Sequence, residues 1–226
     1  MLPNFPNQYF APKPNHVPPN HAAGVRERLM AFKGEGDEFD RHVVSCALAT
    51  AMAEVDYHPL TEALGLARNT IAEILEKMFP GSYSIDELVP QNANPGDDAP
   101  AEPVLREMLI ANRTSAVPLE SWVAHIFIRR CQVGDHMWRS IGLFSRNELT
   151  EAMIRYFKPF AVKNIYDLKW KRFIYKQMRE ENNLDLEKYP YCENCSREII
   201  TADGERFPFC AHCPDFEECS ATEDVL

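Results

Sequence analysis

The sequence predicts a mainly α-helical protein: two packed helical-hairpin repeats followed by a C-terminal cysteine-rich metal-binding loop. Three observations support this prediction. Apolar residues recur every three or four positions over several stretches, which is typical of amphipathic helices. Similar landmarks then return roughly 78 residues later. Finally, five of the seven cysteines fall between Cys192 and Cys219, at spacings that suit a metal site.

Composition limits the classes of function. The chain has 226 residues, of which 45% are hydrophobic and 26% charged, enough to bury a globular core. Its formal net charge of -10 argues against general binding to nucleic acid. The sequence contains no apolar run of membrane-spanning length and no basic start followed by an apolar core. We therefore expect a cytoplasmic protein, in which cysteines serve metal or redox chemistry rather than disulfides.

Three segments are expected. Residues 1–38 begin with many prolines and predict a disordered arm. Residues 39–183 form the helical domain, and residues 184–226 form the metal-binding tail. In the first helix of the domain, Cys46 lies among small apolar residues and is expected to be a buried apolar side chain.

The repeats are placed at about 40–80 and 119–159, with a Pro- and Asp-rich linker at about 80–103. Each repeat carries a Gly-Leu pair, then an Arg-Asn pair, then a phenylalanine followed by proline. In order these are Gly65-Leu66, Arg68-Asn69 and Phe79-Pro80 in the first copy, and Gly142-Leu143, Arg146-Asn147 and Phe157-Lys-Pro159 in the second. Ser145 and Glu148 have the spacing of a capping box. A further helix is expected from Val104 to Arg113.

A second amphipathic stretch directly precedes the tail. Its apolar stripe consists of Trp170, Phe173, Ile174 and Met178, and its basic face of Lys169, Lys171, Arg172, Lys176 and Arg179. Interleaved aromatic and basic residues can bind nucleic acid. The alternative is a packed helix whose basic side faces solvent or the acidic tail, because residues 184–226 carry eleven acids and three bases.

The tail cysteines allow two ligand sets. Cys192-x2-Cys195-x14-Cys210-x2-Cys213 is close to the spacing of a zinc ribbon and leaves Cys219 spare. Alternatively, Cys210, Cys213 and Cys219 hold an iron–sulfur cluster together with one ligand from upstream. Thiolates suit both metals. A third hypothesis is a redox sensor that uses a vicinal pair of thiols.

Four stretches together resemble the NifQ family of nitrogen-fixation proteins. They run from Asp135-His-Met-Trp138 to Leu149, from Tyr156 to Asn164, from Leu168 to Gln177 and from Cys210 to Cys219. The resemblance extends from about Phe39 to Cys219. It implies a carrier of an iron–sulfur cluster with molybdenum, which supplies the metal for the nitrogenase iron–molybdenum cofactor. The implied partners are the cofactor-assembly scaffold and the nitrogenase reductase.

This sequence departs from the family pattern C-x4-C-x2-C-x5-C at its first cysteine, where Glu205 stands. Cys192 or Cys195 could supply the missing thiolate. His136 and His212 are further candidate ligands. No catalytic set of nucleophile, base and carboxylate is recognisable, so we expect no enzyme, and the carrier function is what the family resemblance implies. The alternative function is an interaction module clipped by a zinc ribbon.

Overall fold

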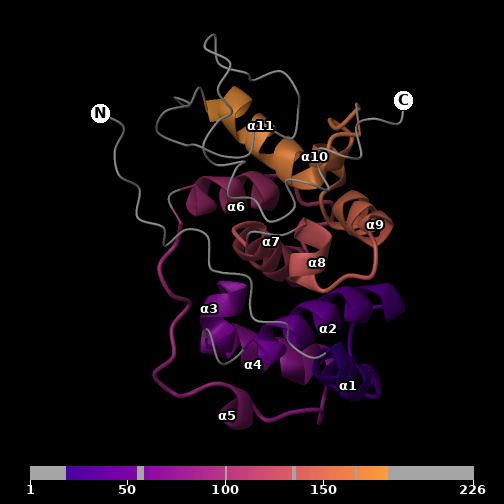
Figure 1. Cartoon of the computed structure of the whole chain (residues 1–226), viewed down its shortest axis with the longest axis vertical. Coiled ribbons are helices and arrows are strands. Elements are labelled where there is room, and N and C mark those ends of the chain that lie inside the picture. The colour runs from indigo at the N-terminus through magenta and orange to yellow at the C-terminus, as the bar shows by residue number, and fades with distance from the viewer. Residues whose placement is uncertain (1–18, 55–58, 100, 134–135, 166, 183–226) are drawn as a thin grey trace.

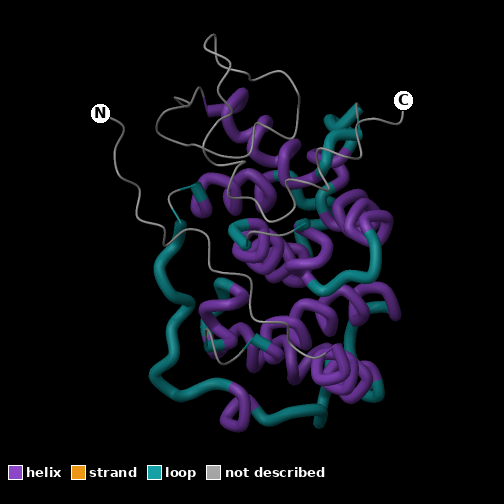
Figure 2. The backbone as a smooth tube through the Cα atoms, in the orientation of Figure 1, coloured by secondary structure: helices purple, strands orange, loops and turns teal. Residues whose placement is uncertain are grey.

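The computed structural model describes residues 19–54, 59–99, 101–133, 136–165 and 167–182, and these residues form eleven helices and no strand (Figures 1 and 2). In chain order the helices are α1 Pro19–Met30, α2 Glu38–Ala53, α3 Leu60–Leu64, α4 Arg68–Met78, α5 Ile85–Leu88, α6 Glu102–Ala111, α7 Pro118–Cys131, α8 Met137–Ile141, α9 Arg146–Tyr156, α10 Lys158–Ala161 and α11 Trp170–Asn182. The predicted mainly α class is confirmed. Across this described part, no helix combines the length and the apolar character that crossing a membrane requires.

Helix α1 corrects the expectation that residues 1–38 form a disordered arm. Pro19 opens the helix, where its missing N–H costs nothing, and no proline follows before Met30. Val25 and Leu29 are buried because α1 packs along α2. Residues 1–18 lie outside the described residues.

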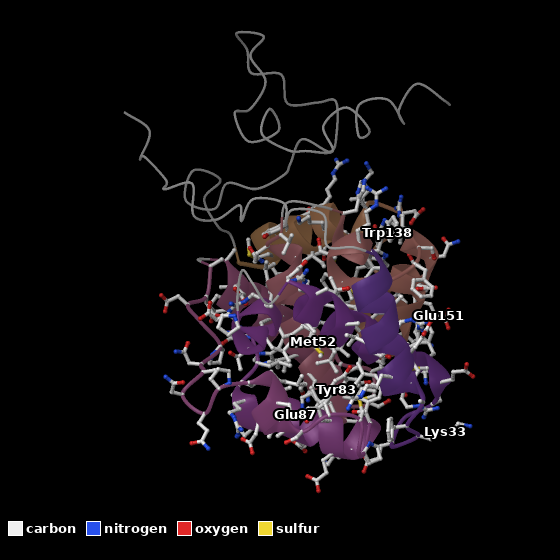
Figure 3. The ribbon with its side chains drawn as sticks, turned by 60° about the horizontal axis from the view of Figure 1, so that its bottom comes forward. Lys33, Met52, Tyr83, Glu87, Trp138 and Glu151 are labelled. Atoms are coloured by element: carbon white, nitrogen blue, oxygen red, sulfur yellow. The ribbon has the colours of Figure 1, made fainter. Side chains whose placement is uncertain are left out.

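Helices α1–α5 form the lower part of the molecule and α6–α11 the upper part, and the two parts meet where α3 contacts α7 and α2 contacts α8 (Figure 1). Along α2 every side chain from Val43 to Ala49 is buried, so this helix is enclosed on all sides. The largest fully enclosed side chains are those of Phe79, Phe127, Phe157 and Phe160. Charged side chains such as those of Glu87 and Glu151 point outward from this core (Figure 3).

Matching helix ends occur at the two places where the sequence landmarks repeat. Gly65 ends α3 and Gly142 ends α8, both in the left-handed conformation that favours glycine, with φ 63° and 87°. Phe79 ends α4 and Phe157 ends α9, with φ -135° in both cases. Two short helices therefore end alike, and two eleven-residue helices end alike. The duplication itself stays a prediction.

The expected linker is tied to the helical body. It contains the short helix α5, which Ser84 and Glu87 cap reciprocally. Further along, Arg129 of α7 donates to the carbonyl of Pro95 at 3.1 Å and forms an ion pair with Asp98 at 3.1 Å. Arg129 also contacts the buried carboxylate of Glu102 at 2.7 Å, at the start of α6. The helix expected from Val104 to Arg113 is therefore present as α6, two residues earlier.

Buried polar pairs connect helices that lie far apart in the sequence. Arg130 of α7 makes two hydrogen bonds, of 2.6 and 2.8 Å, to the carboxylate of Glu54 at the end of α2. Its Nε also donates to the carbonyl of Ser140 in α8 at 2.6 Å. The Tyr156 hydroxyl of α9 donates to Asp40 of α2 at 2.9 Å. Because an unpaired buried charge is costly, these pairs fix the positions of the helices relative to one another.

Candidate metal centre

The predicted metal ligands all follow the last helix. Cys192, Cys195, Cys210, Cys213 and Cys219 lie outside the described residues, as do His212 and Glu205. Both ligand sets therefore stay predictions. What the structure describes is the helical body to which this tail is joined at Asn182, and in particular helix α11.

The predicted apolar stripe of α11 is confirmed. Trp170, Phe173, Ile174 and Met178 are all buried against the body. The Phe173 ring lies 5.0 Å from that of Phe160 and 5.9 Å from that of Trp170, measured between centroids. Trp170 also donates its indole N–H to the Thr150 hydroxyl of α9 at 2.8 Å. Helix α11 is thus a packed part of the core, and it gives the tail a fixed starting point.

The basic side of α11 takes part in this packing. Lys171 donates to the carbonyl of Val133, just after α7, at 2.7 Å. Tyr175 donates to the side chain of Gln132 at 3.0 Å. Lys176 pairs with Glu180 one turn later on the same helix. The described contacts therefore favour the packed-helix interpretation of this stretch over the nucleic-acid interpretation.

His136 begins α8. Its carbonyl accepts from the backbone N–H of Ser140 at 2.9 Å, while its side chain makes no capping hydrogen bond. His136 therefore stands directly before α8, and its role as a metal ligand stays a prediction. His136 is three residues after Val133 in the chain, so it lies near the hydrogen bond that Lys171 donates to the Val133 carbonyl.

The two cysteines of the body are poor metal ligands. Cys46 and Cys131 are buried, as expected for Cys46. Burial raises the pKa of the Cys46 thiol to about 12 and that of Cys131 to about 11. Metal coordination needs both the thiolate and access to the metal, so burial disfavours both side chains as ligands.

Beside Cys46 lies a polar pair that the sequence did not reveal. His42 Nε2 is 3.0 Å from a carboxylate oxygen of Glu148, and Cys46 Sγ lies 3.7 Å from His42 Nδ1. Glu148 is held in place because it also accepts from the N–H of Phe144 at 2.9 Å and its own N–H donates to Ser145. The Ser145–Glu148 spacing was a visible signal, but its partner His42 is 106 residues away. Within the described ranges, no group of three or more His, Cys, Asp or Glu side chains could hold a metal ion.

Comparison with known proteins decides the family. The family model described as NifQ matches residues 43–200. The chain belongs to the NifQ family. Members of this family take part in nitrogen fixation. The match includes Cys192 and Cys195 and ends before Cys210.

Individual relatives agree with this assignment. The chain is 31% identical over 164 residues to "Protein NifQ homolog" of Sinorhizobium fredii, an alignment that covers 70% of this chain and 69% of the relative. It is 32% identical over 142 residues to "Protein NifQ" of Azotobacter vinelandii, covering 58% and 73%. For "Protein NifQ" of Rhodobacter capsulatus the identity is 30%, covering 61% and 74%. No solved structure matches the chain.

Proposed function

We propose that this NifQ-family protein carries an iron–sulfur cluster that holds molybdenum, and that it supplies molybdenum for biosynthesis of the nitrogenase iron–molybdenum cofactor. The cluster is cargo, and the protein is a carrier and not an enzyme. It acts in the cytoplasm. Its partners are the scaffold on which the cofactor is assembled and the nitrogenase reductase.

One observation carries the proposal: the chain keeps its two body thiols buried and places the other five in one acidic tail. Cys46 and Cys131 are buried and their pKa values are raised, so they compete poorly for the metal. The five tail cysteines fall within 28 residues, from Cys192 to Cys219. Thiolates are the ligands that iron–sulfur clusters prefer.

The proposed ligands are Cys210, Cys213 and Cys219 together with one thiolate from Cys192 or Cys195. Glu205 is the less suitable fourth ligand, because a carboxylate is a hard donor and the cluster is soft. The proposal therefore includes both cysteine groups of the tail in one site.

Zinc is the alternative cargo, and the spacing of the first four tail cysteines favours it. Cys192, Cys195, Cys210 and Cys213 would then form a closed tetrahedral site, and Cys219 would have no part in it. Such a site would stabilise the tail as an interaction module and would not transfer metal.

Anaerobic purification with metal analysis tests the proposal. We expect a coloured protein with broad visible absorption that contains iron and binds molybdenum. Serine variants of Cys210, Cys213 and Cys219 should each lose the cluster, whereas Cys46→Ala and Cys131→Ala, as matched controls in the body, should keep it. A colourless protein that contains zinc alone, even after reconstitution with iron and sulfide, would overturn the proposal. Loss of metal on changing Cys192 but not Cys219 would favour the zinc module.

A further inference from the structure

The two most exposed large apolar side chains among the described residues lie at the point where the tail begins. Val162 is 62% exposed and Ile165 is 76% exposed. Between them, Lys163 forms an ion pair of 2.7 Å with Glu181, in the last turn of α11. The described chain ends one residue later, at Asn182.

These side chains stand on a segment with a defined shape. The side chain of Asn164 both donates to the carbonyl of Leu168 and accepts from its N–H, each at 2.9 Å. Arg146 of α9 donates to the carbonyl of Asp167 at 3.0 Å. An exposed apolar pair on a segment that is already held in place is a ready binding surface, because little conformational entropy is lost when it is covered.

We propose that residues 184–191, the root of the cysteine-rich tail, dock on Val162 and Ile165. This root carries two leucines and two tyrosines within eight residues, namely Leu184, Leu186, Tyr189 and Tyr191. In an extended conformation Leu184 and Leu186 fall on one face, since side chains two residues apart point the same way. Apolar side chains on both partners are therefore available for the contact.

Charge and tethering favour this occupant over a separate protein. The root carries two acids, Asp185 and Glu187, against one base, Lys188, and Lys158 lies four residues before Val162. The root begins three residues after Lys163's partner Glu181, so its effective concentration at the surface is on the order of millimolar or higher. A free partner with the same affinity for the surface would have to reach a comparable concentration to displace it.

Docking would determine where the first cysteine pair lies. Eight residues span at most about 28 Å, so a root held on Val162 would keep Cys192 within about that distance of the end of α10. The inference rests on the proposed function in one respect, namely that this tail is the metal loop. The docking contact itself does not need the metal.

Methyl-labelled NMR of the metal-free full chain tests the contact. We expect nuclear Overhauser effects between the methyl groups of Val162 or Ile165 and those of Leu184 or Leu186. Amides of residues 184–191 should also exchange about tenfold more slowly than in an unstructured peptide, as for a weakly stable local contact. Both effects should be lost in Val162→Ser/Ile165→Ser. They should persist in Val117→Ser, which changes an exposed valine that begins α7.

Two results would overturn this inference. The first is unprotected exchange and no methyl contact in the wild-type chain. The second concerns the Val162→Ser/Ile165→Ser variant. If amide exchange of residues 184–191 in this variant equals that of the wild type while binding to the scaffold protein is weakened, the surface belongs to a partner. Because the measurement uses metal-free protein, it fails or succeeds independently of the metal analysis that tests the carrier function.

Discussion

Gly142 ends α8 so close to Thr50 of α2 that a Cβ atom at this position would lie 2.0 Å from the threonine Oγ1. The same Cβ would lie 2.7 Å from the carbonyl oxygen of Cys46, and the backbone φ of 87° is strained for any other residue. Gly65 at the end of α3 stands in a similar place against α7. There a Cβ would meet the side chain of Arg129 at 3.2 Å.

Alanine at these two glycines should therefore destabilise the fold to different extents. We expect Gly142→Ala to lower the free energy of unfolding by about 3 kcal/mol or more, because steric overlap with backbone adds to the cost of a left-handed alanine. Gly65→Ala should cost about 2 kcal/mol, since the neighbouring side chain can shift. Gly24→Ala in α1, where nothing lies within 4 Å of the new methyl, is the control and should stabilise the helix by about 0.5–1 kcal/mol. Urea unfolding measures all three, and equal losses at Gly142 and Gly65 would contradict the geometric argument.

The sequence predicted those features whose physical cause lies within a few neighbouring residues. The glycines that end α3 and α8 and the apolar period of Trp170 to Met178 each act within a few residues of the chain. They were therefore visible without the fold. Helix α1 was missed because the prolines before it dominated the composition of the first 38 residues, although Val25 and Leu29 carry a helical spacing.

Contacts between distant residues left no such signal. Arg130 and Glu54 are 76 residues apart, and Tyr156 and Asp40 are 116 apart. Each residue alone is an ordinary charged or aromatic member of an amphipathic helix. Which of the many acids pairs with which base depends on how the helices pack, so these pairs appear only in three dimensions.

The half-buried imidazole of His125 should make stability depend on pH. It lies 3.2 Å from the carbonyl of Gly65, and burial lowers its pKa, as do the nearby charges of Arg106 and Arg129. The unfolded chain then binds a proton more readily than the folded chain. The contribution of His125 to the free energy of unfolding should therefore be constant above neutral pH and decrease as the pH falls through about 6.5, the ordinary pKa of histidine.

His125→Asn isolates this effect, because the asparagine amide can still donate to the carbonyl of Gly65 but does not titrate. We expect the variant to lose much of the decrease in stability between neutral pH and about 5.5. The carboxyl groups of Asp37 and Asp98, whose pKa values are lowered mainly by hydrogen bonds, lose their contribution only at more acidic pH. Denaturant unfolding at a series of pH values measures how the free energy of unfolding depends on pH. Identical curves for the wild type and the variant would show that His125 does not cause the decrease at acidic pH.

The two body cysteines should be separable from the five tail cysteines by reactivity. In reduced, metal-free native protein at neutral pH, a thiol reagent should modify the tail cysteines and leave Cys46 and Cys131 unmodified until the protein unfolds. For Cys46, a pKa of about 12 in place of 9.0 lowers the thiolate fraction about a thousandfold, and burial blocks access as well. Mass spectrometry of timed samples locates the label. Early modification of Cys46 or Cys131 would mean that α2 or α7 opens readily, and these thiols could then compete for the cargo metal.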